Sequence, residues 1–320
     1  MPHLIEKIAY VGSAPWHRLG SKLPAKQPIE VWAASAGMDW DIREAPVRYS
    51  TEGDGSDLHI FPEQKVLFRS DNGRPLSVVG GRYQVVQPRA VLEFYRDLTE
   101  ISGYELETAG VLKDGKKFWA LAKIGKEAAL RGGDVVKGYL LLATSCDGTL
   151  ATTATPTTIR VVCSNTLAIA LGETTSALRV PHSTRFDAQA LKVRLGISVS
   201  RWDDFMYQMK ELATRKVKGH ESAKFFRKVL GFPEGQSADD QALLHERAMK
   251  RVQELYEGHG HGAELPSAKG TAWGLLNAVT EYVDHERRAR TAEYRLDSAW
   301  FGQGAAIKQR ALIEAVEMLA

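Results

Sequence analysis

The residues that could do chemistry in this chain form short patterns, and the sharpest pattern combines two acids with a lysine. Glu107 precedes Asp114-Gly115-Lys116, and carboxylates that hold a cation near a lysine are typical of metal-dependent nucleases. Asp-Gly is also the pair that best tolerates a tight hairpin turn, where a metal ligand would be exposed and poorly supported. A hairpin tip therefore explains the pattern better, and a metal-dependent enzyme acting on nucleic acid stays an alternative.

Two further patterns contain histidines: one is a pair of histidines, and the other is a glutamate with a histidine. His259 and His261 lie two positions apart in the glycine-rich run GHGHG, and Glu281 and His285 share one face of an expected helix. Neither pair has a third ligand at a suitable spacing. A solvated loop and a helix-surface pair explain them better, so we expect no metal ion and no cofactor.

Common patterns for nucleophilic catalysis and nucleotide binding are missing from the sequence. It contains no GxSxG motif. Neither Cys146 nor Cys163 has a histidine nearby in the sequence that would indicate an activated thiol. The paired glycines at 80–81 and 132–133 match neither a phosphate-binding loop nor a dinucleotide-binding motif. The cysteines lack a zinc spacing, and we expect both to be reduced and buried. These observations favour a non-catalytic protein over an enzyme.

Basic side chains gather in the second half of the chain. Residues 192–230 carry ten lysines or arginines against four acids, whereas residues 231–265 carry three against seven. A basic segment can neutralise phosphates and release counterions, but a solvated helix face explains the same surplus. A second basic group, open to the same two interpretations, consists of Arg287, Arg288, Arg290 and Arg295.

Six basic residues are the candidates for contacts with DNA phosphates. Two lie beside expected strands and four lie in the basic helical segment. They are Arg82, Arg160, Lys216, Lys218, Arg227 and Lys228. Aromatic side chains near the basic groups could stack on bases, although their helical spacing is also typical of a core. Taken singly, each candidate is explained better as an ordinary surface charge.

The composition is that of a soluble globular protein with one or two domains. The 320 residues are 44% hydrophobic and 25% charged, which is enough to bury one large core or two smaller ones. The formal net charge of +3 is too small to prove a nucleic-acid partner, so local charge matters more. The first residues lack a signal-peptide pattern, and no later run reaches about 18 apolar residues. We expect a cytoplasmic protein that does not span a membrane.

The most readable stretch for fold is residues 139–171. Asp147-Gly148 predicts a hairpin between strands at 140–143 and 149–155. Pro156 is expected to break the second strand. A third strand is expected at 159–163, followed by a helix at 166–171 with Ser164 or Asn165 as its N-cap.

The other expected elements are hairpins in the first half and helices in the second. Up to Asp71 the chain looks irregular, with only a turn or two of helix near 29–36. The expected hairpins join 76–79 to 83–86 and 104–112 to 117–124, and a helix is expected from Pro88 to about Thr99. After about residue 185 the apolar residues follow a helical period. The expected helices are 186–217, 238–256, 271–290 and 305–319.

The predicted fold class is α+β, with an antiparallel β-meander core bracketed by helices and followed by a mostly helical C-terminal part. The predicted organisation is an α+β domain over residues 1–184. Residues 185–320 would form a helical region that packs on this domain or makes a second one.

Several blocks together resemble a known family. They are residues 78–98, 139–151, 155–171 and 270–290. They resemble the phage/plasmid-like protein family, which is carried as a domain of unknown function in bacterial mobile elements. The resemblance implies a mobile-element context, in which DNA replication, recombination or defence evasion are common tasks. The order of helix, antiparallel strands and helix is also similar to the core of ring-forming single-strand annealing proteins, but no functional residues carry over.

Three functions stay open. The leading one is a mobile-element accessory protein that binds DNA without catalysis, related to single-strand annealing or recombination, with single-stranded DNA as the favoured partner. The second is the metal-dependent enzyme acting on nucleic acid. The third is a protein-interaction module that targets a host factor through the apolar stripe of the helix expected at 186–217. A homo-oligomer is compatible with each of them.

Overall fold

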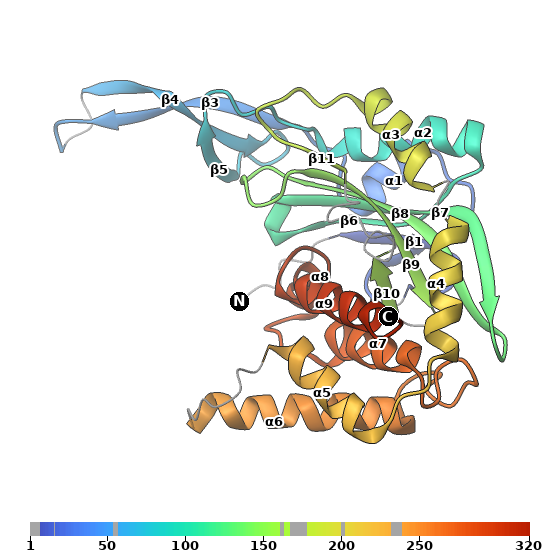
Figure 1. Ribbon diagram of the computed structural model, residues 1–320. Helices are drawn as coiled ribbons and strands as arrows, with labels where there is room; N and C mark the ends of the chain where they lie inside the picture. Colours follow the sequence, from blue (N-terminus) through green and yellow to red (C-terminus); the bar gives the residue numbers. More distant parts are fainter. Residues whose placement is uncertain are drawn as a thin grey trace.

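The computed structural model describes residues 7–15, 17–53, 57–160, 163–166, 178–199, 202–231 and 239–320. These residues form a large antiparallel sheet, a smaller three-stranded sheet and helices on both sides of the large sheet (Figure 1). The predicted α+β class is therefore confirmed. No helix in the described part of the chain is both long enough and apolar enough to cross a membrane.

The large sheet is built mainly from consecutive antiparallel strands in the order β10-β9-β8-β7-β6-β1-β2, and β11 also pairs with β9. Strand β2 pairs with β1 in parallel. The strands are β1 (Ile8–Val11), β2 (Ser21–Leu23), β6 (Glu105–Leu112), β7 (Lys117–Leu130), β8 (Asp134–Ser145), β9 (Thr152–Arg160), β10 (Cys163–Thr166) and β11 (Leu178–Val180). The predicted meander is thus the centre of the sheet.

Two predicted Asp-Gly turns join strands of this meander. Asp114 adopts a left-handed conformation with φ of 58° between β6 and β7. In the β8–β9 connection, Oδ1 of Asp147 accepts hydrogen bonds from the backbone N–H of Thr149 at 3.0 Å and from its hydroxyl at 2.6 Å. Short aspartate side chains tolerate both geometries, so the local sequence sets these reversals.

The prediction that Pro156 breaks its strand is wrong. Strand β9 continues through Pro156, which lies opposite Leu140 of β8. On the other side of β9, β11 pairs as far as Ala154 and β10 pairs only from Thr157. Pro156 therefore falls between two short partner strands, at a position where its missing N–H interrupts neither ladder.

The predicted cap at Asn165 is also wrong. Asn165 lies in β10, opposite Thr158 of β9, so it belongs to the sheet and not to a helix start. Thr166 is the last residue of the same strand. The rest of the helix expected at 166–171 lies outside the described residues.

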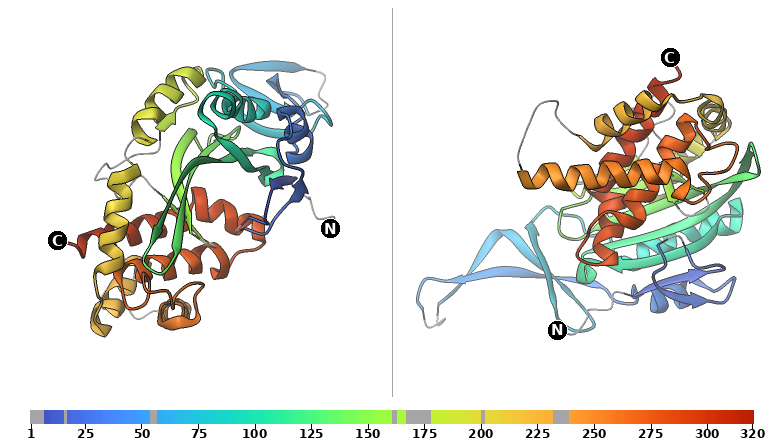
Figure 2. Two further views of the ribbon diagram at one scale, coloured as in Figure 1. Left: turned by 90° about the vertical axis from the view of Figure 1, so that its right-hand side faces the viewer. Right: turned by 90° about the horizontal axis from the view of Figure 1, so that it is seen from below.

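The smaller sheet forms an arm, and the prediction that this region is irregular is wrong. It consists of β3 (Ile42–Ser50), β4 (Leu58–Arg69) and β5 (Pro75–Gly80), in that order. The ends of β3 and β4 that lead to their connection extend away from the body of the protein (Figures 1 and 2). Most side chains there are exposed, so the strands lack the alternating apolar pattern that would predict them. The expected hairpin across Gly80-Gly81 is absent because β5 pairs with β4.

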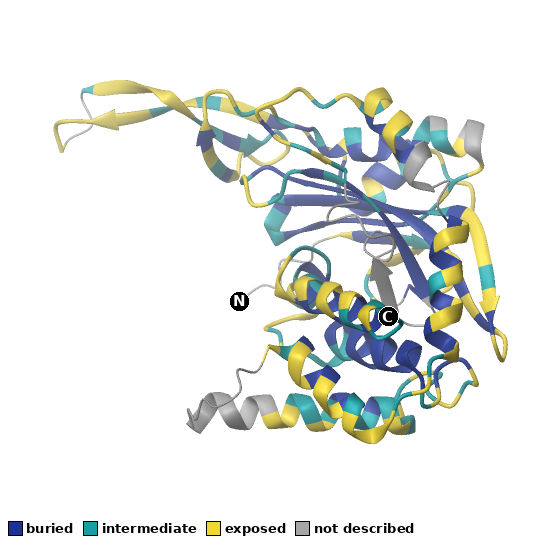
Figure 3. Ribbon diagram, in the orientation of Figure 1, coloured by how far each residue is buried: buried dark blue, intermediate teal, exposed yellow. Residues whose placement is uncertain are grey.

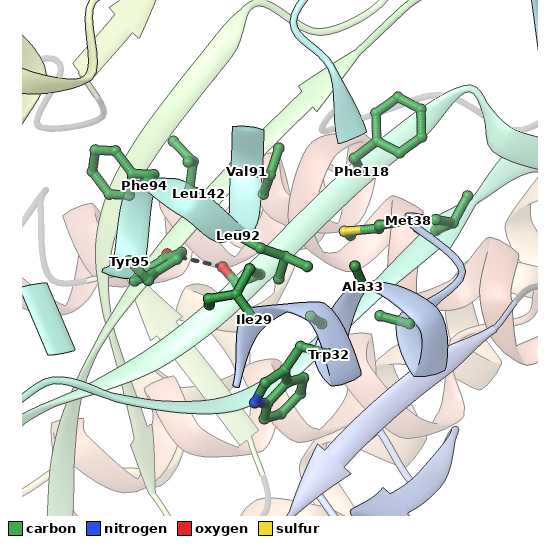
Figure 4. Packing of buried hydrophobic residues seen from close by; sticks show 14 of the residues in the cluster. Ile29, Trp32, Ala33, Met38, Val91, Leu92, Phe94, Tyr95, Phe118 and Leu142 are labelled. Atoms are coloured by element: carbon green, nitrogen blue, oxygen red, sulfur yellow. Dashed lines mark hydrogen bonds between the residues drawn. The ribbon is translucent and has the colours of Figure 1, made fainter. Parts of the chain in front are cut away.

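One face of the large sheet is covered by α1 (Ile29–Ala36), α2 (Pro88–Ser102) and α3 (Ala188–Val199). Their buried side chains meet Phe118 and Leu142 of the sheet in one apolar cluster (Figure 4). Within that cluster the hydroxyl of Tyr95 lies 2.9 Å from the carbonyl oxygen of Leu140. Helix α2 begins at Pro88, as predicted, because proline suits the first position of a helix.

The other face of the sheet is covered by helices of the C-terminal part (Figures 1 and 3). The helices of this part are α4 (Trp202–Thr214), α5 (Gly219–Leu230), α6 (Asp239–Glu254), α7 (Ala272–Glu281), α8 (Ala292–Phe301) and α9 (Gln303–Glu317). Of these, α5 and α6 lie farther from the sheet and pack on the other helices. Trp119 and Leu121 of β7 face these helices, whereas Phe118 and Ala120 face the first helix layer, as the two-residue period of a strand requires. The mostly helical C-terminal part is confirmed, although α5 and α8 were not expected.

Two of the expected long helices are divided. The helix expected at 186–217 is two helices, α3 and α4, and the one expected at 271–290 ends as α7 at Glu281. A π-helical turn at Tyr282–Glu286 follows α7, and a second such turn at Leu255–His259 follows α6. Because π-helical turns often occur at functional sites, the region between them is of interest for function.

Candidate nucleic-acid interface

The six predicted phosphate contacts do not form one site. Arg82 is exposed in the turn after β5, at the end of the molecule that carries the arm, whereas α5 lies at the opposite end (Figures 1 and 2). Arg160 is the last residue of β9, and its side chain lies outside what the structure describes. The other four surround α5, so the structure divides the candidates into separate groups.

Two of the four candidates near α5 make contacts within the protein, Lys228 through its ammonium group and Lys218 through its backbone N–H. The Nζ of Lys228 lies 2.6 Å from Glu314 and 3.3 Å from Glu317, and these acids raise the pKa of Lys228. Lys218 is the N-cap residue of α5, where its backbone N–H donates to Glu221 at 2.7 Å. Lys216 and Arg227 are exposed. This group fits a solvated and internally paired helix face better than a phosphate track.

The acids and lysine of the nuclease pattern are not gathered at a common point. Glu107 accepts a hydrogen bond from the Tyr139 hydroxyl at 3.0 Å and pairs with Lys123 at 2.8 Å. Asp114 instead lies at the turn between β6 and β7, where its carboxylate is 3.4 Å from Arg74. Among the described residues, no group of three histidine, cysteine, aspartate or glutamate side chains could hold a metal ion.

The apolar stripe considered as a docking face for a host protein is internal. Trp202, Phe205, Met209 and Leu212 of α4 are all buried in the core shared by the C-terminal helices. The stripe is therefore explained by packing within this chain.

The second basic group forms a defined structure, which we name the arginine turn (residues 287–295). It connects the π-helical turn after α7 to α8, whose N-cap is Thr291. The guanidinium of Arg287 donates to Ser298 Oγ at 3.1 Å and also to Gln303 Oε1. Arg295 donates through Nε to the carbonyl oxygen of Arg287 at 3.1 Å. These bonds tie the start of the turn to α8 and α9 and join its two ends to each other.

The arginine turn surrounds a basic cavity of about 280 Å³. Arg287, Arg288, Arg290 and Arg295 line this cavity together with Tyr294, and no acid does. Arg288 and Arg290 are exposed, and neither pairs with an acid anywhere in the described ranges. An anion that enters this cavity would meet guanidinium groups that are not already neutralised.

Tyr294 also belongs to the wall of a larger, mainly apolar hollow of about 860 Å³. Ile8, Leu19, Leu23 and Leu112 line this hollow as well. The tyrosine side chain is large and its residue is 48% exposed. Tyr294 therefore lines both the basic cavity and this mainly apolar hollow.

Two charged residues of the hollow are already paired. Lys113 lies 2.8 Å from Asp297 and Asp114 lies 3.4 Å from Arg74. The Asp297 carboxylate raises the pKa of Lys113. The Nζ of Lys113 lies 6.0 Å from the centre of the Tyr294 ring, at the outer limit of a cation–π contact.

A third cavity, of about 390 Å³, adjoins the arginine turn. It shares Ala292 with the mainly apolar hollow and Arg295 with the basic cavity. His261 and Glu281 both line it, and His261 Nδ1 lies 2.5 Å from Glu281 Oε1. His261 lies in a loop with its side chain 54% exposed, as predicted, but the prediction that Glu281 belongs to a helix-surface pair is wrong, because its side chain is only 7% exposed. Only the fold joins them, because they lie 20 positions apart on different elements.

A comparison with protein-family models gives one match. A model described as a domain of unknown function, DUF932, matches residues 75–300. The matched range begins at β5 and includes the arginine turn and most of α8. Neither the curated proteins nor the solved structures that were compared with the chain gave a match.

Proposed function

This chain belongs to the family of domains of unknown function DUF932, and we propose that it binds single-stranded DNA, without catalysis, through the arginine turn. The observation that carries the proposal is the position of Tyr294, a residue that lines both the basic cavity and the mainly apolar hollow. Single-stranded nucleic acid presents phosphates and base faces within a few ångströms of each other. Proteins bind it by pairing basic groups with phosphates and by stacking aromatic rings on bases.

The shape of the site supports a single strand over a duplex. Stacking on Tyr294 requires an exposed base face, which the interior of a duplex does not offer. The hollow beside the tyrosine is lined by aliphatic side chains such as Leu19 and Leu23, and these suit the apolar face of a base. Arg288 and Arg290 would bind the adjoining phosphates, and such contacts carry no sequence preference by themselves.

The biological setting is also part of the proposal. The resemblance to phage/plasmid-like proteins supports an accessory protein of a mobile element, working in the cytoplasm in single-strand annealing or recombination. A homo-oligomer would place several arginine turns along one strand and so raise the overall affinity. A host protein remains the alternative partner. Co-purification of a stable host protein from nuclease-treated extract would favour that alternative.

The test compares substitutions of Tyr294 in titrations of a fluorescein-labelled oligothymidine followed by fluorescence anisotropy at low salt. Tyr294→Ala should weaken binding about 5- to 150-fold, because stacking of a base on an aromatic ring contributes roughly 1–3 kcal/mol. Tyr294→Phe keeps the ring and should bind like the wild type. Equal affinity of the wild type and Tyr294→Ala would overturn the proposed site.

Tyr207 offers a matched control, because it is also an exposed tyrosine, at 66%, and lies on α4. Tyr207→Ala should leave the affinity unchanged. A loss as large as that of Tyr294→Ala would mean that exposed aromatic residues contribute without regard to position, which would contradict a defined site.

A further inference from the structure

A fourth cavity, of about 300 Å³, lies between the large sheet and the helices that cover its second face. Threonines of β9 line it from the sheet, and the end of α8 and the first turns of α9 line it from the other side. Protein interiors are packed so closely that spaces larger than a water molecule are few. A space of this size instead reaches the range of cavities that hold small ligands.

Small side chains on both layers leave this space open. Ala143 of β8 lines the cavity from the sheet, and Ala299, Ala305 and Ala306 line it from the helices. Phe301 adds an aromatic side chain to the same lining. A space between two packed layers with apolar walls suits a flat ring better than a bulky group.

The sheet side of the cavity carries hydroxyl groups that a ligand can reach. Thr153, Thr155 and Thr157 alternate along β9, so their side chains share one face of the sheet. The Thr153 hydroxyl donates to the carbonyl oxygen of Ala151 at 2.8 Å and can still accept a hydrogen bond. The Thr155 hydroxyl has no partner among the described residues, so it can both donate and accept.

The opposite side adds the amide of Gln309, which likewise has no partner in the described part of the chain. A side-chain amide offers donors and an acceptor together. The edge of a nucleobase also presents donors and acceptors side by side. The hydroxyl of Thr155 and the amide of Gln309 therefore match the edge of a base without requiring a particular protonation state.

The charge at the cavity is basic. Arg179 of β11 lies opposite Thr153 of β9, is exposed, and pairs with no acid in the described ranges. Lys308 also lines the cavity, but its Nζ lies 2.8 Å from Asp284, so its charge is already neutralised. None of the described residues of the lining is an acid. An anionic group of a ligand would therefore be attracted to Arg179.

Helix α8 connects this cavity to the arginine turn. Ser298 lines the basic cavity, and the next residue, Ala299, lines this one. Tyr294 and Trp300 are six positions apart on α8, which corresponds to about 9 Å along the helix axis. A strand of a few nucleotides can span such a distance.

We propose that this cavity binds one nucleotide, with its base between β9 and α9 and its phosphate at Arg179. A nucleotide combines the three properties that the cavity selects: a flat ring, an edge of donors and acceptors, and an anionic group that a guanidinium binds strongly. The inference rests on the proposed function in one respect, because the nucleotide is taken to be a unit of the bound strand. A free nucleoside monophosphate has the same chemistry.

The position of the base is tested by photocrosslinking with an oligothymidine in which 5-iodouracil replaces thymine. Long-wavelength ultraviolet light joins this base to an aromatic side chain that it touches. Trypsin separates residues 291–295, which contain Tyr294, from residues 296–308, which contain Trp300 and Phe301. Mass spectrometry should find crosslinks on both peptides. Crosslinks on residues 291–295 alone would overturn the inference and leave the proposed function standing.

The contacts are tested by anisotropy titrations of a labelled oligothymidine at low salt. Arg179→Met should weaken binding about tenfold, the effect of a hydrogen bond to a charged group. Arg185→Met is the matched control, because Arg185 is also exposed, follows β11, and carries the same charge. It should bind within about twofold of the wild type. Thr155→Val keeps the branched shape and should weaken binding about threefold.

The outcomes separate the two proposals. If Arg179→Met and Thr155→Val both bind like the wild type, the inference is overturned and the proposed function stands. Equal losses in Arg179→Met and Arg185→Met also overturn it, because charge alone would then explain them. If the wild type binds no strand, the proposed function fails, and calorimetric titration with thymidine 5′-monophosphate decides for the cavity. Binding that is lost in Arg179→Met supports a site for the free nucleotide, and no binding overturns it.

Discussion

The Nζ of Lys117 lies 2.6 Å from Oδ1 of Asp297, so an ion pair in the interior joins strand β7 to helix α8. Their side chains are only 6% and 11% exposed. Lys113 binds the other carboxylate oxygen of Asp297 at 2.8 Å. This aspartate therefore fixes α8, whose first turn belongs to the arginine turn, to the central hairpin of the sheet.

Removal of the shared acid should destabilise the protein more than removal of one lysine. Asp297→Asn leaves two lysines without their carboxylate, and we expect a loss of about 3–5 kcal/mol, as for other buried pairs that lose one partner. Lys113→Met should cost less, because Lys117 still neutralises Asp297. Urea unfolding followed by circular dichroism measures both values. Equal stabilities of Asp297→Asn and the wild type would show that the pair does not hold α8.

We expect the buried His17 to lower the free energy of unfolding in mild acid. Its pKa in the folded protein is about 3, below the usual 6.5 of the unfolded chain, so the unfolded state binds the extra proton between these values. Stability from this group is therefore complete above about pH 6.5 and falls as the pH drops towards 3, by at most about 1.4 kcal/mol per pH unit. His17→Asn should flatten that part of the profile in urea unfolding at pH 7.5, 6.5 and 5.5. Parallel profiles for the two proteins would contradict the prediction.

Cys146 should resist thiol reagents in the folded protein. Its side chain is buried, and burial raises the pKa of the thiol to about 12, so very little thiolate exists at pH 8. In a Cys163→Ser variant, a chromogenic disulfide reagent should label Cys146 rapidly only after urea is added. Complete labelling within seconds under native conditions would contradict its placement in the core.

The salt dependence of DNA binding should report the number of phosphates bound at the arginine turn. For single strands the slope of log K against log salt changes by about 0.7 for each phosphate contact. Arg288→Ala/Arg290→Ala should therefore reduce the slope by about 1.4, measured by anisotropy titrations between 50 and 300 mM salt, roughly the range in which such effects are large. An unchanged slope in the double variant would place the phosphate contacts elsewhere.

Features that depend on neighbouring residues were predictable from the sequence. The turns at Asp114 and Asp147 and the helix start at Pro88 follow from the conformations that these residues favour. The continuation of β9 through Pro156 was not predictable, because it depends on where β10 and β11 end on the neighbouring edge. At Pro156 the strand pairing outweighs the tendency of proline to end a strand.

The candidate sites show the same division. The arginine group at 287–295 is visible in the sequence, but the fold decides that no acid among the described residues pairs with Arg288 or Arg290. Lys228 shows the converse, because Glu314 and Glu317, which neutralise it, lie on another helix. The pairing of His261 with Glu281 required a turn that brings residues 20 positions apart together, and no spacing rule within one element signals it.

DNA binding at the arginine turn is tested by the affinity of Arg288→Ala/Arg290→Ala for a labelled oligothymidine at low salt. The matched control is Lys224→Ala/Arg227→Ala, which removes two exposed basic residues of α5 and so the same formal charge. We expect the first variant to bind at least about tenfold more weakly than the wild type, and the control to bind within about twofold of it. Equal losses in the two variants, or no loss in the first, would contradict the arginine turn as the DNA-binding site.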